Sequence, residues 1–94
     1  MNIKNILASE QKTIVDVREP WEFAEGHFPD AINIPLGDIM ANPNQLTEAQ
    51  LPIVAYCRSG NRSQSAMMFL KANGISEVYN GGSLHQLQSM LELS

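Results

Sequence analysis

The chain has 94 residues, of which 44% are hydrophobic and 17% charged, and its formal net charge is −4. This size suits one small domain over residues 1–94, and the composition is that of a globular rather than a disordered protein. The acidic balance argues against nucleic-acid binding. No apolar run approaches the length that crosses a bilayer and the first residues lack the pattern of a secretory signal, so we expect a cytoplasmic protein without a membrane partner.

The sequence predicts alternating short strands and helices. Apolar runs rich in β-branched residues indicate strands at 13–17, 31–35, 51–56 and 77–80. Helix signals predict a short helix that begins at Pro20 and ends near Gly26, one or two short helices in 36–50, and a longer helix over 62–73. A last helix is predicted after the Gly-Gly pair, with Leu84, Leu87 and Leu91 facing inward. Before Thr13 there is no clear strand, and residues 2–7 are more typical of a helix.

Alternation of strands and helices is typical of an α/β domain with a mostly parallel sheet and helices on both faces. In such sheets ligands bind beyond the carboxyl ends of the strands. Cys57 lies at this position, after the most apolar strand and before the best helix. It is the only cysteine, which excludes an internal disulfide and a cysteine-rich zinc site. We expect no metal and no organic cofactor, and we predict a monomer.

The loop "CRSGNRS", residues 57–63, has the composition of an anion cradle. A tight turn from strand to helix directs several backbone N–H groups and the positive end of the helix dipole towards one point. Gly60 permits a bend with positive φ, and Arg58 and Arg62 are two of only six basic residues in the chain. Three further side chains can brace the loop or cap the helix, namely Ser59, Asn61 and Ser63.

A thiol at the centre of such a cradle should have a lowered pKa and react as a thiolate. The loop therefore indicates nucleophilic displacement on an anionic electrophile. Two substrate classes remain open on this ground: sulfane sulfur donors such as thiosulfate, which would leave a persulfide on Cys57, and phosphate esters. The alternative is that Cys57 is an inert packing residue. Its position at the end of a strand, followed by a glycine and two arginines within five residues, disfavours this alternative.

Three segments resemble the single-domain rhodanese family of thiosulfate-type sulfurtransferases. They are "IVDVREPWEFAEGHFPDAINIP", "IVAYCRSGNRSQSA" and "GISEVYNGG", and together they cover the chain from Thr13 to about Leu91. The resemblance implies a rhodanese-like three-layer fold with a four- to five-stranded parallel sheet. It also implies that Cys57 carries the sulfur, that the backbone N–H groups of 58–63 hold the persulfide and the donor, and that both loop arginines bind the donor's sulfonate.

Two details refine this resemblance. Cysteine-based phosphatases place five residues between cysteine and arginine, whereas four residues separate Cys57 from Arg62; the shorter loop favours sulfur chemistry. The family usually has a tryptophan a few residues after the Gly-Gly pair, and this chain has Gln86 there. This departure puts substrate preference in doubt more than the chemistry.

We therefore predict a sulfurtransferase that moves sulfane sulfur from an anionic donor to a thiol or cyanide acceptor through a Cys57 persulfide. A non-catalytic or sulfur-carrying rhodanese module that acts through a protein partner is the main alternative, and a phosphatase is a weaker one. The remaining conspicuous side chains are predicted to be structural. Asp16 and Arg18 would brace a loop, with glutamates as partners of Arg18. His27 would be a hydrogen-bonded structural residue, and Trp21 and Phe23 would serve packing. His85 lies on a helix that starts near the loop.

Overall fold

The computed structural model describes residues 2–92 and contains one sheet of four parallel strands in the order β2-β1-β3-β4. The strands are β1 (Thr13–Asp16), β2 (Ile32–Asn33), β3 (Ile53–Cys57) and β4 (Val78–Ser83). Each predicted strand is present, with shifted bounds, and every pairing is parallel. The α/β prediction is confirmed.

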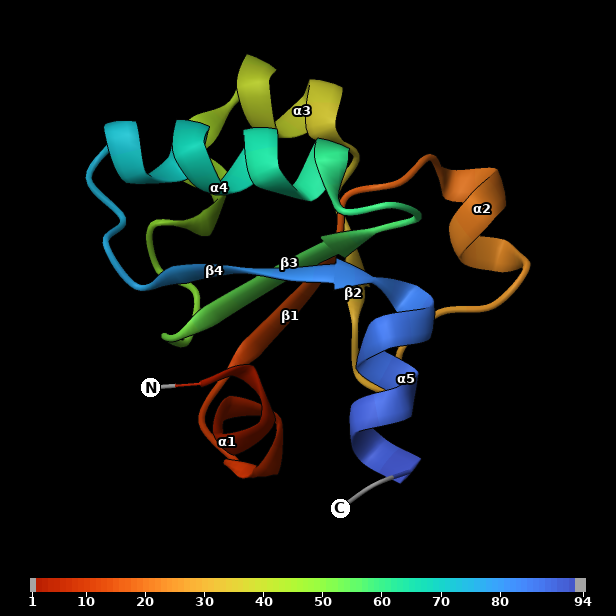
Figure 1. Ribbon diagram of the computed structural model, residues 1–94. Helices are drawn as coiled ribbons and strands as arrows, with labels where there is room; N and C mark the ends of the chain where they lie inside the picture. The colour runs from red at the N-terminus through yellow and green to blue at the C-terminus, as the bar shows by residue number, and fades with distance from the viewer. Residues whose placement is uncertain (1, 93–94) are drawn as a thin grey trace.

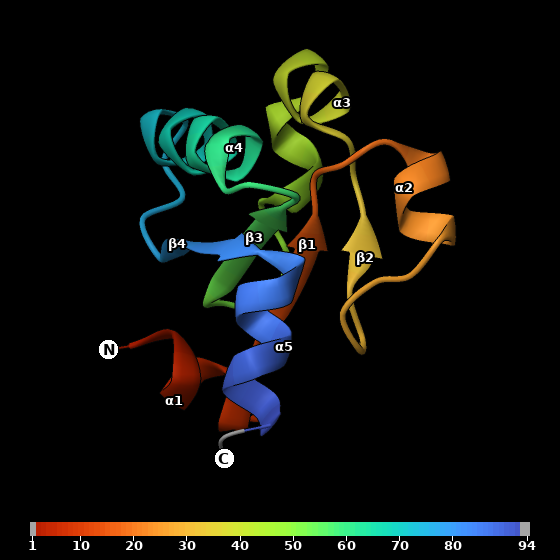
Figure 2. The ribbon, with the colours of Figure 1, turned by 45° about the vertical axis from the view of Figure 1, so that its right-hand side comes forward.

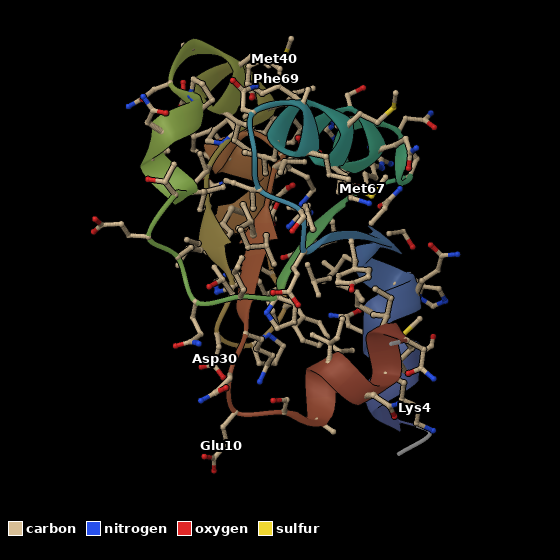
Figure 3. All side chains as sticks on the ribbon, turned by 90° about the vertical axis from the view of Figure 1, so that its left-hand side faces the viewer. Lys4, Glu10, Asp30, Met40, Met67 and Phe69 are labelled. Carbon is tan, nitrogen blue, oxygen red and sulfur yellow. The ribbon has the colours of Figure 1, made fainter. Side chains whose placement is uncertain are left out.

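Helices cover both faces of this sheet (Figure 1). They are α1 (Ile3–Ala8), α2 (Pro20–Ala24), α3 (Leu36–Ala41), the 3-10 helix η1 (Pro43–Leu46), α4 (Asn61–Ala72) and α5 (Leu84–Glu92). Helices α3 and α4 lie on one face and α1 and α5 on the other, whereas α2 lies beside the edge strand β2 (Figure 2). Figure 3 labels Met40 on α3 and Met67 and Phe69 on α4, the two helices that pack together on the first face.

The central strand β3 is buried along its whole length, as its continuous apolar sequence requires. Its side chains alternate between the faces: Ile53, Ala55 and Cys57 belong to the core under α3 and α4, whereas Val54 and Tyr56 belong to the core against α1 and α5. Cys57 is therefore the last side chain of β3 on the α4 face. This alternation places the thiol directly below the start of α4.

Residues 2–12 contain a helix and no strand, as the sequence indicates. Asn2 caps α1, because its side-chain oxygen accepts a hydrogen bond from the N–H of Asn5 at 2.8 Å. Ile6 and Leu7 bury the inner face of this helix. The described part of the sheet therefore has four strands.

Two expectations for the carboxyl-terminal part need correction. The Gly-Gly pair does not end the last strand but lies inside β4, where the register shifts from Ala55–Asn80 to Tyr56–Gly82. Gly81 is the additional residue, and a Cβ atom there would lie 2.9 Å from Val54 Cγ1, closer than packing allows. Leu87 is buried, but Leu91 is 42% exposed, so the prediction that it faces inward is wrong.

Among the described residues no helix is long and apolar enough to span a membrane. Within the same residues, no group of three or more histidine, cysteine, aspartate or glutamate side chains is arranged to hold a metal ion.

Candidate active site

Cys57 ends β3, and after a three-residue turn α4 begins at Asn61. The turn closes at Gly60, which has φ +94° and is the N-cap of α4. This left-handed conformation favours glycine. A Cβ atom at Gly60 would also lie 3.4 Å from Gly82 Cα, so the two glycines let the loop approach β4. The loop projects from the end of β3 towards α2 (Figure 1).

The Cys57 sulfur faces this loop. The backbone N–H of Gly60 donates a hydrogen bond to Sγ at 2.9 Å, and Ser63 Oγ lies 3.5 Å from Sγ. Burial of Cys57 tends to raise the pKa of its thiol. Hydrogen bonds from the Ser63 side chain and from the N–H groups of Ser63, Ser59 and Gly60 favour the thiolate and leave the pKa below its ordinary value. The sulfur therefore has the electrostatic environment of a nucleophile.

Cys57 has no exposed surface in this structure, although the loop residues Arg58 and Ser59 above it are exposed. The Cys57 sulfur is thus shielded from solvent in this structure. The side chains of Ser59 and Asn61 make no hydrogen bonds within residues 2–92. Of the three predicted bracing side chains, Ser63 alone contacts the sulfur.

A second layer of hydrogen bonds lies behind the loop and centres on Asn80 of β4. Asn80 Oδ1 accepts from Ser63 Oγ at 2.6 Å and from the Gly82 N–H at 2.9 Å. Asn80 Nδ2 donates to the Gly60 carbonyl at 3.1 Å and to Gln64 Oε1 at 3.0 Å. Asn80 is thus bound to Gly60 and Ser63, two of the residues that hydrogen-bond the sulfur. Nothing in the sequence marks Asn80 as functional, since a polar residue before a Gly-Gly pair indicates the end of a strand.

The two loop arginines have different surroundings. Arg58 is exposed and makes no hydrogen bond or ion pair with any described residue. Arg62 forms a bidentate ion pair with Glu22 of α2, Nη1 to Oε1 at 2.7 Å and Nη2 to Oε2 at 3.0 Å. This pairing lowers the pKa of Glu22 to about 2. Arg62 thus ties α2 to the first turn of α4, and Arg58 alone offers an uncommitted guanidinium at the loop.

A pocket of about 510 Å³ opens beside Arg58, between α2 and α5. Its lining residues are Arg18, Trp21, Glu22, Glu25, Gly26, Arg58, Leu84, His85 and Gln88. The prediction that Trp21 serves packing is wrong, because its side chain is 63% exposed at this pocket. His85 also lines it, but no histidine is among the described groups that contact the Cys57 sulfur.

A buried ionic cluster lies at the end of β1. Arg18 binds Asp16 through Nε and Nη2 and donates from Nη2 to the Gly26 carbonyl at 2.8 Å. Tyr56 Oη donates to Asp16 Oδ2 at 2.8 Å and accepts the Phe28 N–H at 2.9 Å. Asp16 and Arg18 therefore brace the loop after β1, as predicted, but the partner of Arg18 is Asp16 rather than a glutamate.

The histidine and phenylalanine of the first motif form a local packing unit, as predicted. The His27 and Phe23 rings are stacked, with centroids 3.7 Å apart and planes 7° from parallel. His27 Nδ1 also lies 3.0 Å from the Phe23 carbonyl oxygen. Although His27 is exposed, its contacts are those of a structural residue.

The family model for the rhodanese-like domain matches residues 2–84 of this sequence. The chain belongs to the rhodanese-like family. It is 37% identical over 76 residues to the thiosulfate sulfurtransferase GlpE of Pseudomonas syringae, a match that covers 79% of this chain and 69% of the relative. It is also 37% identical over 73 residues to the putative sulfur carrier protein YrkF of Bacillus subtilis, with 78% and 39% covered.

Among solved structures, the human single-domain sulfurtransferase TSTD1 superposes with a TM-score of 0.77 at 25% identity, and the match covers 93% of this chain and 89% of the other. The rhodanese-like chain spans 16% to 52% of the length of four of the curated relatives it matches. The rhodanese-like family and its fold are thus established, and several of the relatives are named sulfurtransferases.

The departure at Gln86 from the usual rhodanese tryptophan has a structural explanation. Gln86 Oε1 accepts the Ser83 N–H at 2.8 Å, while the Gln86 N–H donates to Ser83 Oγ at 3.0 Å. These reciprocal bonds are a capping box at the start of α5, and the sequence "SLHQ" has its S-x-x-Q pattern. Gln86 therefore anchors α5 to the end of β4, a role that a tryptophan side chain cannot perform by the same bond.

Proposed function

We propose that this protein is a sulfurtransferase that accepts sulfane sulfur on Cys57 from an anionic donor such as thiosulfate and passes it to a thiol or cyanide acceptor. The observation that carries the proposal is the position of the Cys57 sulfur. Sγ accepts a hydrogen bond from the Gly60 N–H at the N-terminus of α4, and the pKa of the thiol is lowered although burial tends to raise it. A packing cysteine needs neither feature.

In the first half-reaction the loop moves outward and the Cys57 thiolate attacks the outer sulfur of thiosulfate. A new S–S bond forms on Cys57, the S–S bond of thiosulfate breaks, and sulfite leaves with the electron pair of that bond. The backbone N–H groups of residues 58–63, including that of Gly60, stabilise the persulfide anion. Arg58 binds the sulfonate, since it is the loop cation that no other described side chain occupies.

In the second half-reaction a thiolate or cyanide attacks the outer sulfur of the persulfide and the Cys57 thiolate is released. The acceptor approaches through the pocket beside Arg58, whose volume of about 510 Å³ suits a small molecule or an extended side chain of a partner. Trp21 offers an exposed ring along this approach. No step requires a metal or an organic cofactor.

The relatives support this reading at the level of their names. GlpE of Pseudomonas syringae is named a thiosulfate sulfurtransferase, and TSTD1 is named a sulfurtransferase. The putative sulfur carrier YrkF favours the second candidate, in which another protein delivers or receives the sulfur on Cys57. A phosphatase is disfavoured because four residues separate Cys57 from Arg62 and because Glu22 already occupies Arg62.

Mass spectrometry of the intact protein after thiosulfate treatment tests the proposal. We expect one added sulfur atom on the wild-type protein, its removal by cyanide, and none on the Cys57→Ser variant. A known rhodanese labelled in parallel controls for the donor. An unlabelled wild-type protein beside a labelled control would overturn the proposal.

Two further measurements separate the alternatives. A carrier is indicated if the persulfide forms only when a second protein supplies the sulfur and if that partner still binds Cys57→Ala. Ready hydrolysis of an aryl phosphate that is lost in Cys57→Ser would instead favour the phosphatase.

A further inference from the structure

The hydroxyl of Ser63 has a single hydrogen and three acceptors within reach. They are Asn80 Oδ1 at 2.6 Å, the Gly60 carbonyl at 3.1 Å and the Cys57 sulfur at 3.5 Å. A serine hydroxyl donates one hydrogen bond at a time. The direction of this hydrogen therefore decides whether Ser63 supports the charge on the sulfur.

The surroundings of Asn80 fix the orientation of its amide. The Gly82 N–H donates to Oδ1, and the two acceptors on the other side, the Gly60 carbonyl and Gln64 Oε1, require the Nδ2 hydrogens. A flipped amide would place donor against donor and acceptor against acceptor. Asn80 thus presents an oxygen to Ser63, and the bond between them has the serine as donor.

The Gly60 carbonyl is a poor competitor for the serine hydrogen. It already accepts the N–H of Gln64 at 3.0 Å and Nδ2 of Asn80 at 3.1 Å, which occupy its two lone pairs. The effective choice for the hydrogen is therefore between Asn80 and the Cys57 sulfur. With the hydrogen on Asn80, Ser63 faces the sulfur with a lone pair, which suits a protonated thiol. With the hydrogen turned to the sulfur, it supports the thiolate.

We propose that Asn80 is a positioning residue that competes with the Cys57 sulfur for the Ser63 hydroxyl hydrogen and so sets how readily the thiolate forms. The proposal rests on the proposed function only in taking Cys57 as the reacting group. Asn80 touches no substrate and acts through Ser63, which is fully buried between the two. The charged groups around the cradle are Arg58 on the loop, Arg62 on α4 and Glu22 on α2, and the variants below leave them unchanged.

The test is a titration of Cys57 by the ultraviolet absorbance of its thiolate, read as the difference from the Cys57→Ser protein. Since the chain has one cysteine, the difference spectrum reports this thiol alone and removes the two tyrosines. Asn80→Ala frees the hydrogen. The Gly60 carbonyl also loses its bond to Asn80 Nδ2, but the charged thiolate is a stronger acceptor than a neutral carbonyl, so the pKa of Cys57 should fall by about half a unit to one unit, the shift of one hydrogen bond. Asn80→Asp holds the hydrogen more strongly and adds a negative charge, so it should raise the pKa.

Two controls isolate the route through Ser63. In the Ser63→Ala background, Asn80→Ala should produce no further shift, because no hydroxyl remains to redirect. Gln64→Ala removes the other side chain bound to Asn80 and should leave the pKa unchanged, since Gln64 does not contact the sulfur.

Opposite signs for Asn80→Ala and Asn80→Asp, with the first effect abolished in Ser63→Ala, would support the proposal. An unchanged or raised pKa in Asn80→Ala would overturn it, and so would a fall that persists without Ser63. If Asn80→Ala does not fold, the nearly isosteric Asn80→Asp decides: a pKa that does not rise contradicts the proposal. Because the readout is the thiol itself, a failure of sulfur transfer would leave this result interpretable.

Discussion

Neighbouring strands of the sheet, β1 and β3, both end in a buried polar cluster, and the two clusters differ in how completely they are satisfied. At the end of β1, the carboxylate of Asp16 receives Arg18 and Tyr56, and each of these has a further backbone partner. At the end of β3, the single hydroxyl hydrogen of Ser63 has several possible acceptors. The guanidinium of Arg58, on the same loop, has no partner in residues 2–92.

This difference distinguishes a cluster that stabilises the fold from a cluster that can react. A cluster whose charges and hydrogens are all committed holds one conformation, because any change leaves a buried group unpaired. A cluster with one movable hydrogen and an open cation can change its charge and receive an anion. Tyr56 joins the two clusters, because it pairs with Asp16 in the sheet, its carbonyl accepts the Val17 N–H, and it immediately precedes Cys57. The first cluster thus fixes the end of the strand from which the second one acts.

The largest expected effect is loss of stability at the β1 cluster. Asp16→Asn leaves the guanidinium of Arg18, whose side chain is 9% exposed, without its counter-charge. Breaking a buried ion pair in this way costs about 3 to 5 kcal/mol of the free energy of unfolding. Urea denaturation measures the loss, and Cys57→Ser is the comparison, with an expected loss below about 1 kcal/mol because it removes no charge pair.

The double variant Asp16→Asn/Arg18→Met sharpens this result. Because it removes both charges, its loss of stability should be smaller than the sum of the two single losses. Persulfide labelling of Asp16→Asn under conditions where it is folded should persist. Loss of labelling in a folded Asp16→Asn protein would mean that the first cluster takes part in the chemistry, and the division between the clusters would be wrong.

The next effect distinguishes the two loop arginines. Glu22→Gln removes the counter-charge of Arg62, whose side chain is partly exposed, and should cost about 1 kcal/mol of unfolding free energy with little change in the KM for thiosulfate. Arg58→Ala should show the reverse: unchanged stability and a KM raised about tenfold. Steady-state kinetics and denaturation of both variants provide the check. A large fall of KM in Glu22→Gln would show that the released Arg62 binds the donor.

The same ion pair predicts a pH dependence. Arg62 lowers the pKa of Glu22 from 4.5 to about 2. A carboxylate with a lowered pKa stabilises the folded protein fully above its unfolded pKa, and this contribution is lost as the pH falls through the folded value. The stability difference between wild type and Glu22→Gln should therefore be constant near neutrality and should close between pH 4.5 and about 2. A difference that stays constant over this interval would exclude the ion pair as its source.

Much of the architecture follows from local sequence. Continuous apolar β-branched runs flanked by proline and glycine locate the strands, and Gly60 marks the turn into α4 with its positive φ. The single cysteine at the end of the most buried strand is likewise visible in the sequence, since parallel strands place their carboxyl ends at one edge. These features depend on neighbours within a few residues.

The features that the sequence did not reveal depend on contacts between distant segments. Glu22 meets Arg62 and Asn80 meets Ser63 only after α2, β4 and α4 have packed around the loop. Trp21, predicted to serve packing, is exposed because α2 lies outside the sheet, beside the edge strand. Whether an arginine binds an anion or a neighbouring carboxylate is settled by such packing and not by its spacing from the cysteine.

The smallest effect concerns Gln86, the departure from the family pattern. Gln86→Ala removes one half of the capping box of α5 and should cost about 0.5 to 1 kcal/mol of unfolding free energy, because the Ser83 N–H loses its partner. Gln86→Glu, which retains the capping oxygen, is the matched control and should cost less. Because Gln86 does not contact the Cys57 sulfur, neither variant should change the rate of persulfide formation. A slowed rate in Gln86→Ala but not in Gln86→Glu would indicate that the anchoring of α5 controls the pocket, and would extend the reactive cluster of β3 across to that helix.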